Sequence, residues 1–213
     1  MSILKLFHGA AQGSREVVID IETTGLYTHE GHRIIEIAAI ELKGGRMTGK
    51  EFHALVNPGR DIPADVIKIH GITNEKVKGR SDFAAIAQQL KDFIGNDPVV
   101  ITCRTTEDGY VLDKAFLNME LEKAGLQKID DAQWVNVRRW SEEMFGDKNA
   151  KLDKVLDRYE ISRKERDTNG HGAALDARLL AEVYPLLLKD YKKFTEKKPL
   201  AQSQLPPKNN PPS

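Results

Sequence analysis

The chain lacks the features of a secreted or membrane protein. It has a single cysteine, Cys103, so no disulfide can form within the chain, and this favours a reducing compartment. No apolar run approaches the roughly 20 residues needed to cross a bilayer. Residues 1–15 contain one lysine and a short apolar patch broken by His8, which makes a poor signal peptide. We therefore expect a cytoplasmic protein with no membrane contact.

The chain also lacks net charge. Its 32 Lys and Arg residues are matched by 32 Asp and Glu residues, so the formal charge at pH 7 is zero. Without a global basic field, any contact with nucleic acid has to be local or helped by a partner. What the chain does have is 40% apolar residues in 213, which is enough for the core of one domain.

Strand signals gather in the first half of the chain and helical signals in the second. Apolar runs bounded by turn residues predict strands at 17–22, 33–42, 51–58 and 98–102. Apolar periodicity and capping residues predict helices at 61–73, 81–95, 114–125, 137–145, 151–158 and about 172–189. We expect a hairpin turn at Gly44-Gly45 and a helix cap at Ser81.

This order of elements predicts an α/β fold with a mixed β-sheet flanked by helices. The strand at 17–22 should lie in the middle of that sheet, buried on both faces. We expect one domain over residues 1–195. The segment 196–213 is rich in Pro, Asn and Ser, and we expect it to form a disordered tail.

Two acids interrupt the predicted central strand, in the stretch VVIDIETTGL. Asp20 and Glu22 are two residues apart, so both side chains point to the same face of the sheet. Two carboxylates this close repel each other unless a cation lies between them, and oxygen ligands favour a hard ion such as Mg²⁺ or Mn²⁺. The alternative is that one or both acids point to solvent at the end of the strand. The stretch also resembles the nucleophile loop of haloacid-dehalogenase-like phosphatases, but that loop has aspartate where this chain has Glu22.

A second candidate cluster lies in HGAALDARLLAEVY, residues 171–184. Asp176 lies beside an apolar helical stripe, and His171 falls in the loop that enters the helix. From there the imidazole could reach over a site that Asp176 lines. An acid beside such a stripe is also commonly solvent-exposed, and a lone histidine is commonly structural.

The successive motifs resemble those of the DEDD exonuclease superfamily, in the branch with a catalytic histidine. The resemblance covers about residues 16–186 and rests on VVIDIETTGL, GRDIPADVIKIHGIT, LDKAFLNMEL and HGAALDARLLAEVY. Within that branch, KNAKLDKVLDRYEI resembles the proofreading epsilon subunits of bacterial DNA polymerase III. The resemblance implies a ribonuclease-H-like fold and 3′→5′ removal of nucleotides from a single-stranded or mismatched DNA end.

The resemblance also implies a role for individual residues. Two divalent ions, Mg²⁺ or Mn²⁺, would be held by four carboxylates: Asp20, Glu22, Asp113 and Asp176. His171 would be the general base, a task suited to a side chain that ordinarily titrates near neutral pH. The residues expected to contact the 3′-terminal nucleotide are Thr23, Gly25, Leu26 and His70. By themselves, Thr23 to Leu26 could simply form a turn, and His70 could pack against its own turn.

The second motif departs from the family pattern. A His-Asn-Ala stretch normally lies between the strand and its aspartate, whereas this chain has several extra residues between Thr102 and Asp113 and no His-Asn pair. Asp113 is preferred to Glu107 and Asp108 because apolar residues follow it at helical spacing. The departure puts substrate contacts in doubt more than metal binding.

Two other functions remain open from sequence. The same chemistry could act on RNA, because discrimination at the sugar depends on pocket contacts. The altered second motif could instead leave an inert polymerase-associated binding subunit. For the leading hypothesis we expect a replicative DNA polymerase as partner, and residues 202–206 loosely resemble a sliding-clamp peptide.

Overall fold

The computed structural model describes residues 13–197 and is built on one five-stranded sheet. The sheet has the order β3-β2-β1-β4-β5, with bounds β1 Arg15–Thr23, β2 Ile34–Lys43, β3 Arg46–Leu55, β4 Val99–Ile101 and β5 Trp134–Asn136. The β1–β2 and β2–β3 pairs are antiparallel, whereas the β1–β4 and β4–β5 pairs are parallel. The predicted mixed sheet with the first strand at its centre is therefore confirmed.

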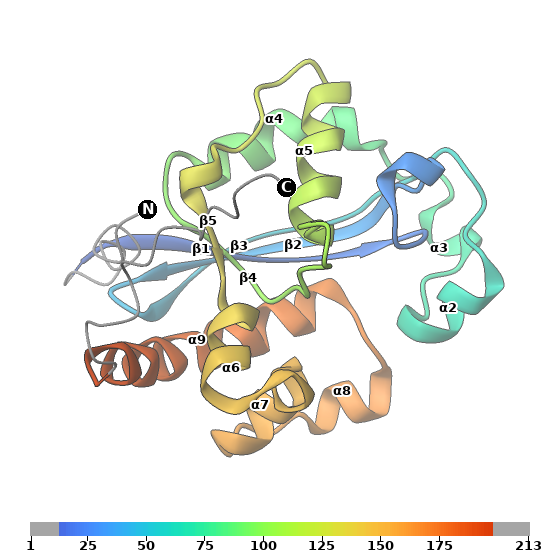
Figure 1. Cartoon of the computed structure of the whole chain (residues 1–213). Helices are drawn as coiled ribbons and strands as arrows, with labels where there is room; N and C mark the ends of the chain where they lie inside the picture. The colour runs from blue at the N-terminus through green and yellow to red at the C-terminus, as the bar shows by residue number, and fades with distance from the viewer. Residues whose placement is uncertain (1–12, 198–213) are drawn as a thin grey trace, which may run out of the picture.

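Helices cover both faces of the sheet (Figure 1). One face carries α4 (Phe83–Ile94) and α5 (Leu112–Lys123), and the other carries α6 (Val137–Phe145), α7 (Leu152–Arg158) and α9 (Ala173–Glu196). Alternate residues of β1 serve the two cores: Val17 and Ile19 pack with α4 and α5, and Val18 packs with α9. The strand that bears Asp20 and Glu22 is thus fixed from both sides.

The remaining helices are short. They are α2 (Ala64–His70), α3 (Asn74–Val77) and α8 (Lys164–Asn169), with 3-10 turns η2 (Thr28–Glu30), η3 (Asp131–Gln133) and η4 (Asp147–Asn149). As expected, α2 follows Pro63 and ends at Gly71, whose φ of 68° suits glycine. No helix between residues 13 and 197 is long and apolar enough to cross a membrane.

Two local expectations were wrong. Asp82, not Ser81, caps α4, because its carboxylate accepts a hydrogen bond from the Ala85 N–H at 3.0 Å. The strand expected at 51–58 begins at Arg46, directly after the tight Gly44-Gly45 turn. Its first five residues are exposed on the edge strand and carry no apolar alternation, so the pattern did not reveal them.

Three elements were not expected from sequence. Strand β5 holds only three residues and extends the sheet beyond β4, while α3 and α8 are short and polar. The expected tail at 196–213 lies outside the described residues except for Glu196 and Lys197, and so does the clamp-like segment 202–206.

Candidate active site

Four carboxylates from three distant segments meet at one end of β1. Oxygen atoms of Asp20, Glu22 and Asp176 all lie within 4.8 Å of one another. Asp113 joins them from α5, close enough that its charge raises the pKa of Asp20. The structure therefore gathers the four acids that the resemblance singled out.

The fold explains why they meet there. Asp20 and Glu22 belong to the last half of β1, and the chain runs from the parallel neighbour β4 through residues 102–111 into α5. Asp113 lies in the first turn of α5 and Asp176 in the first turn of α9, where the helix dipoles favour negative charge. Each acid is buried or half-buried at a point where β1, α5 and α9 meet.

Burial disfavours the charged forms of Asp20, Glu22 and Asp113, and repulsion from neighbouring carboxylates adds to the effect at Asp20 and Glu22. The pKa of Asp20 is raised well above its ordinary value, first by burial and then by the charges of Asp113, Asp176 and Glu22. Burial, followed by repulsion from Asp176, raises the pKa of Glu22 to about 8. Burial likewise raises the pKa of Asp113 to about 7, although a hydrogen bond from the Cys103 thiol opposes the shift. An oxygen-only ligand set under such repulsion fits a hard divalent cation.

One cationic side chain, Arg166 of α8, enters the cluster. Its guanidinium binds both carboxylate oxygens of Asp176, at 2.6 and 3.0 Å, and also pairs with Asp153 of α7. Its positive charge lowers the pKa values of Asp20 and Glu22 and so offsets part of the repulsion. Sequence reasoning missed Arg166, because α8 has no apolar periodicity that would orient its residues.

His171 lies in the loop before α9, as expected, and its side chain is 45% exposed. Its Nδ1 atom is 2.7 Å from Nη2 of Arg166 and 3.5 Å from Oδ2 of Asp176. The arginine can only donate, so Nδ1 accepts this hydrogen bond. A neutral imidazole in this arrangement carries its proton on Nε2.

A second contact fixes the start of α9. The Glu36 carboxylate on β2 accepts a hydrogen bond from the Ala173 N–H at 2.9 Å. The other oxygen of Glu36 is 2.7 Å from Nε2 of His53 on β3. The first turn of α9, which bears Asp176, is therefore attached directly to the sheet.

The residues expected to contact substrate lie in two places. Thr23 is the last residue of β1, and Gly25 and Leu26 lie in the loop directly after it; the Thr23 hydroxyl donates to the Gly25 carbonyl at 2.6 Å. A Cβ on Gly25 would lie 2.3 Å from the His32 ring, so only glycine fits. The Leu26 side chain is 63% exposed and available for contact.

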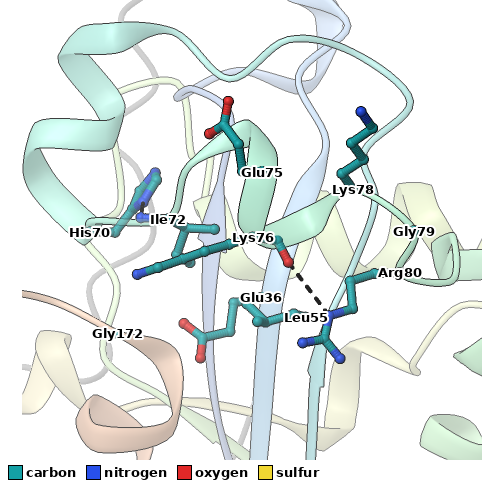
Figure 2. Close-up of a pocket in the computed structure, with 10 residues that line it drawn as sticks. All are labelled: Glu36, Leu55, His70, Ile72, Glu75, Lys76, Lys78, Gly79, Arg80 and Gly172. Atoms are coloured by element: carbon teal, nitrogen blue, oxygen red, sulfur yellow. Dashed lines mark hydrogen bonds between the residues drawn. The ribbon is translucent and has the colours of Figure 1, made fainter.

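His70, the fourth expected contact, is buried at the end of α2. Its Nδ1 accepts from the Ile72 N–H at 3.0 Å, while Nε2 has no hydrogen-bond partner among the described residues. His70 lines an open pocket of about 710 Å³ beside Gly172, the residue after His171 (Figure 2). Cationic side chains at the same pocket are Lys76, Lys78 and Arg80.

The two other acids of the second motif lie away from the cluster. Glu107 and Asp108 are on the exposed side of a turn, and Asp108 binds the Thr106 hydroxyl. Asp113 is only 8% exposed and acts electrostatically on Asp20.

Comparisons with known proteins agree with this geometry. A family model described as an exonuclease, RNase_T, matches residues 17–184. The DNA polymerase III subunit epsilon of Rickettsia felis is 36% identical over 173 residues, covering 80% of this chain and 72% of that protein. The subunit of the same name from Pasteurella multocida is 36% identical over 179 residues, covering 81% of this chain and 68% of that protein.

A solved structure shows the same fold. The nuclease domain of 3'hExo, a DEDDh family member bound to rAMP, has a TM-score of 0.66 and 19% identity, covering 84% of this chain and 94% of that one. The predicted ribonuclease-H-like fold is thereby confirmed. Motif order, fold and sequence identity agree, and this chain belongs to the exonuclease family, in the branch that contains the epsilon subunits of DNA polymerase III.

Proposed function

We propose that this protein is a metal-dependent 3′→5′ exonuclease that removes nucleoside monophosphates from single-stranded or mismatched DNA ends. The observation that carries the proposal is the convergence of Asp20, Glu22, Asp113 and Asp176 beside His171. Its relatives are named as polymerase subunits, and we propose the same role here: proofreading beside a replicative DNA polymerase in the cytoplasm.

The four carboxylates would hold two divalent ions, Mg²⁺ or Mn²⁺. Bound ions of this kind neutralise a phosphodiester and activate water as a nucleophile. The raised pKa values of Asp20 and Glu22 support this assignment, because burial and repulsion from neighbouring carboxylates produce them and a cation relieves the repulsion. Arg166 supplies positive charge at Asp176 in the protein alone, and a divalent ion would compete with it for that carboxylate.

His171 would accept a proton from the attacking water. A base needs a ring nitrogen with a free lone pair, and Arg166 binds the lone pair of Nδ1. The contact between Arg166 and His171 therefore has to open before this proton transfer. The half-exposed position of His171 in a loop leaves room for that movement.

The loop after β1 would receive the terminal nucleotide. The missing Cβ of Gly25 makes room for the His32 ring. The backbone of Gly25 and the exposed Leu26 side chain would contact the terminal nucleotide. His70 would approach from α2, because its buried Nε2 has no partner within residues 13–197 and can donate to a ligand.

The test is digestion of a primer with a 3′ mismatch by the purified protein in Mg²⁺ or Mn²⁺. We expect mononucleotides to be released from the 3′ end, and we expect EDTA or Asp20→Ala to stop the release. A matched RNA strand should be digested more slowly. Faster digestion of the RNA would assign the protein to RNA trimming, and an Asp20→Ala variant as active as the wild type would remove the proposed site.

A further inference from the structure

The connection from β4 to α5 replaces the missing His-Asn-Ala stretch with an ordered turn. Thr105 and Val111 pair as an antiparallel bridge. Inside it, the Thr106 N–H donates to the Tyr110 carbonyl at 3.0 Å and the Gly109 N–H donates to the Thr106 carbonyl at 2.9 Å. The extra residues therefore hold Tyr110 in a defined place shortly before Asp113, the acid in the first turn of α5.

Tyr110 reaches across to the loop that follows β1. Its hydroxyl donates to the Leu26 carbonyl at 3.1 Å and accepts from the Thr28 N–H at 3.3 Å. Its ring lies 5.6 Å from the ring of Tyr27, measured between centroids. The Tyr110 hydroxyl therefore forms hydrogen bonds with the backbone of the residues before and after Tyr27.

The first part of the same loop is held by contacts of Thr24 with Arg33 and His32. The Thr24 hydroxyl accepts from the Arg33 N–H at 3.0 Å and lies 3.1 Å from Nδ1 of His32, whose ring also packs against Gly25. The Leu26 side chain is exposed, so packing does not fix it. The position of Leu26 therefore depends on its backbone, which Tyr110 holds.

We propose that Tyr110 is a positioning residue for the 3′-terminal nucleotide and acts through the backbone of Leu26. This rests on the proposed exonuclease function. Tyr110 fixes the backbone of Leu26, whose apolar side chain would meet the terminal base. In this chain, the connection that lacks the His-Asn-Ala stretch would therefore still support a substrate contact. It contributes to binding the terminal nucleotide and to distinguishing a frayed end from a paired one, and it takes no part in the proton transfer.

The test is Tyr110→Phe, which keeps the ring and removes only the hydroxyl. We expect the KM for a single-stranded DNA oligonucleotide to rise about threefold to tenfold, from the loss of two modest hydrogen bonds, with kcat changed less than about twofold. The inhibition constant of dTMP should rise by the same factor, because that product occupies the terminal position. The preference for a mismatched over a paired 3′ end should fall.

Tyr159→Phe is the matched control, since it removes a tyrosine hydroxyl that binds Asp190 at 3.0 Å in another part of the molecule. It should leave KM, dTMP inhibition and end preference unchanged. Values of all three in Tyr110→Phe equal to wild type would overturn the proposal, and so would a loss confined to kcat and thermal stability. Absence of activity in the wild-type protein would instead overturn the proposed function, and the two failures are distinguishable in one assay.

Discussion

The charged side chains at the two ends of strand β1 are arranged differently: those at the start are paired with opposite charges, and those at the other end are surrounded by like charges. At its start, Arg15 pairs with Glu41 on β2 at 2.5 Å and with Asp97 at 2.6 Å. The Thr48 hydroxyl donates a further hydrogen bond to Glu41 at 2.8 Å. These contacts, first of all the hydrogen bond from Arg15, lower the pKa of Glu41 to about 2.

At the other end of the strand, like charges are brought together. The pKa values of Asp20, Glu22 and Asp113 are raised, and Arg166 supplies only part of the positive charge that four carboxylates need. Paired charges stabilise the folded chain, whereas crowded carboxylates destabilise it. The first end therefore stabilises the fold, whereas the second end is the one at which the proposed function places divalent cations.

The largest expected effect is at the acid end. Asp20→Asn should reduce the rate of mononucleotide release from a 3′-mismatched primer by at least about 10³-fold, because the proposed ion ligand is lost. The same variant should be at least as resistant to urea as the wild type when EDTA is present, because one repelling charge is removed. A variant that is both inactive and markedly less stable would contradict the division between the two ends.

Asp113→Asn should reduce the rate of mononucleotide release less, by about 10²-fold in the same assay, because Asp113 lies at the margin of the cluster. Glu107→Gln is the matched control, since it neutralises an exposed acid of the same connection. Its activity should equal that of the wild type. If Glu107→Gln were the damaging change, the acid of the second motif would have been assigned wrongly.

At the paired end, Glu41→Gln should lower the free energy of unfolding at pH 7 by about 2 kcal/mol without changing exonuclease activity. A lowered pKa means that this stabilisation is present above the ordinary titration range of glutamate and is lost as the pH falls towards 2. The difference between wild type and variant in urea unfolding should therefore shrink as the pH falls from about 4.5.

The control for this change is Glu51→Gln on the neighbouring strand. Glu51 pairs with Arg178 at 2.9 Å, but both side chains are largely exposed, so the loss should be below about 0.5 kcal/mol. Equal losses from the two substitutions would mean that burial of the Arg15–Glu41 pair has no special effect.

The smallest expected effect is a pH dependence of the metal-free protein. Raised carboxyl pKa values mean that the folded state binds more protons than the unfolded state above about pH 4, so stability falls as the pH rises to 8. Glu22→Gln should reduce this fall by about 1 kcal/mol, measured by urea unfolding in EDTA at pH 5 and pH 8. An identical fall in variant and wild type would show that burial and repulsion do not raise the pKa of Glu22.

The sequence predicted the parts of the fold that repeat a simple pattern. The central position of β1, its two acids, the helix after Pro63 and the loop position of His171 all follow from alternation, capping and motif order. Edge strand β3 was only partly predicted, because the exposed residues from Arg46 show no alternation. Short elements such as β5 carry too few residues for any period to appear.

The contacts that complete the site could not be predicted from sequence. Arg166 and Tyr110 lie in polar segments, and each becomes relevant only because the fold brings it to a distant residue, Asp176 or Leu26. The spacing of residues along the chain does not predict contacts between such distant positions. Asp176 could be singled out from sequence as a candidate ligand, but the arginine that pairs with it could not.

The most direct test of the central claim is calorimetric titration of Mn²⁺ into the metal-free protein at pH 7.5, without nucleic acid. If the carboxylates at the end of β1 are kept for cations, the wild type should bind Mn²⁺, and Asp20→Asn should bind it at least about tenfold more weakly while Glu41→Gln binds it normally. No binding by the wild type, or equal binding by the wild type and Asp20→Asn, would contradict the account.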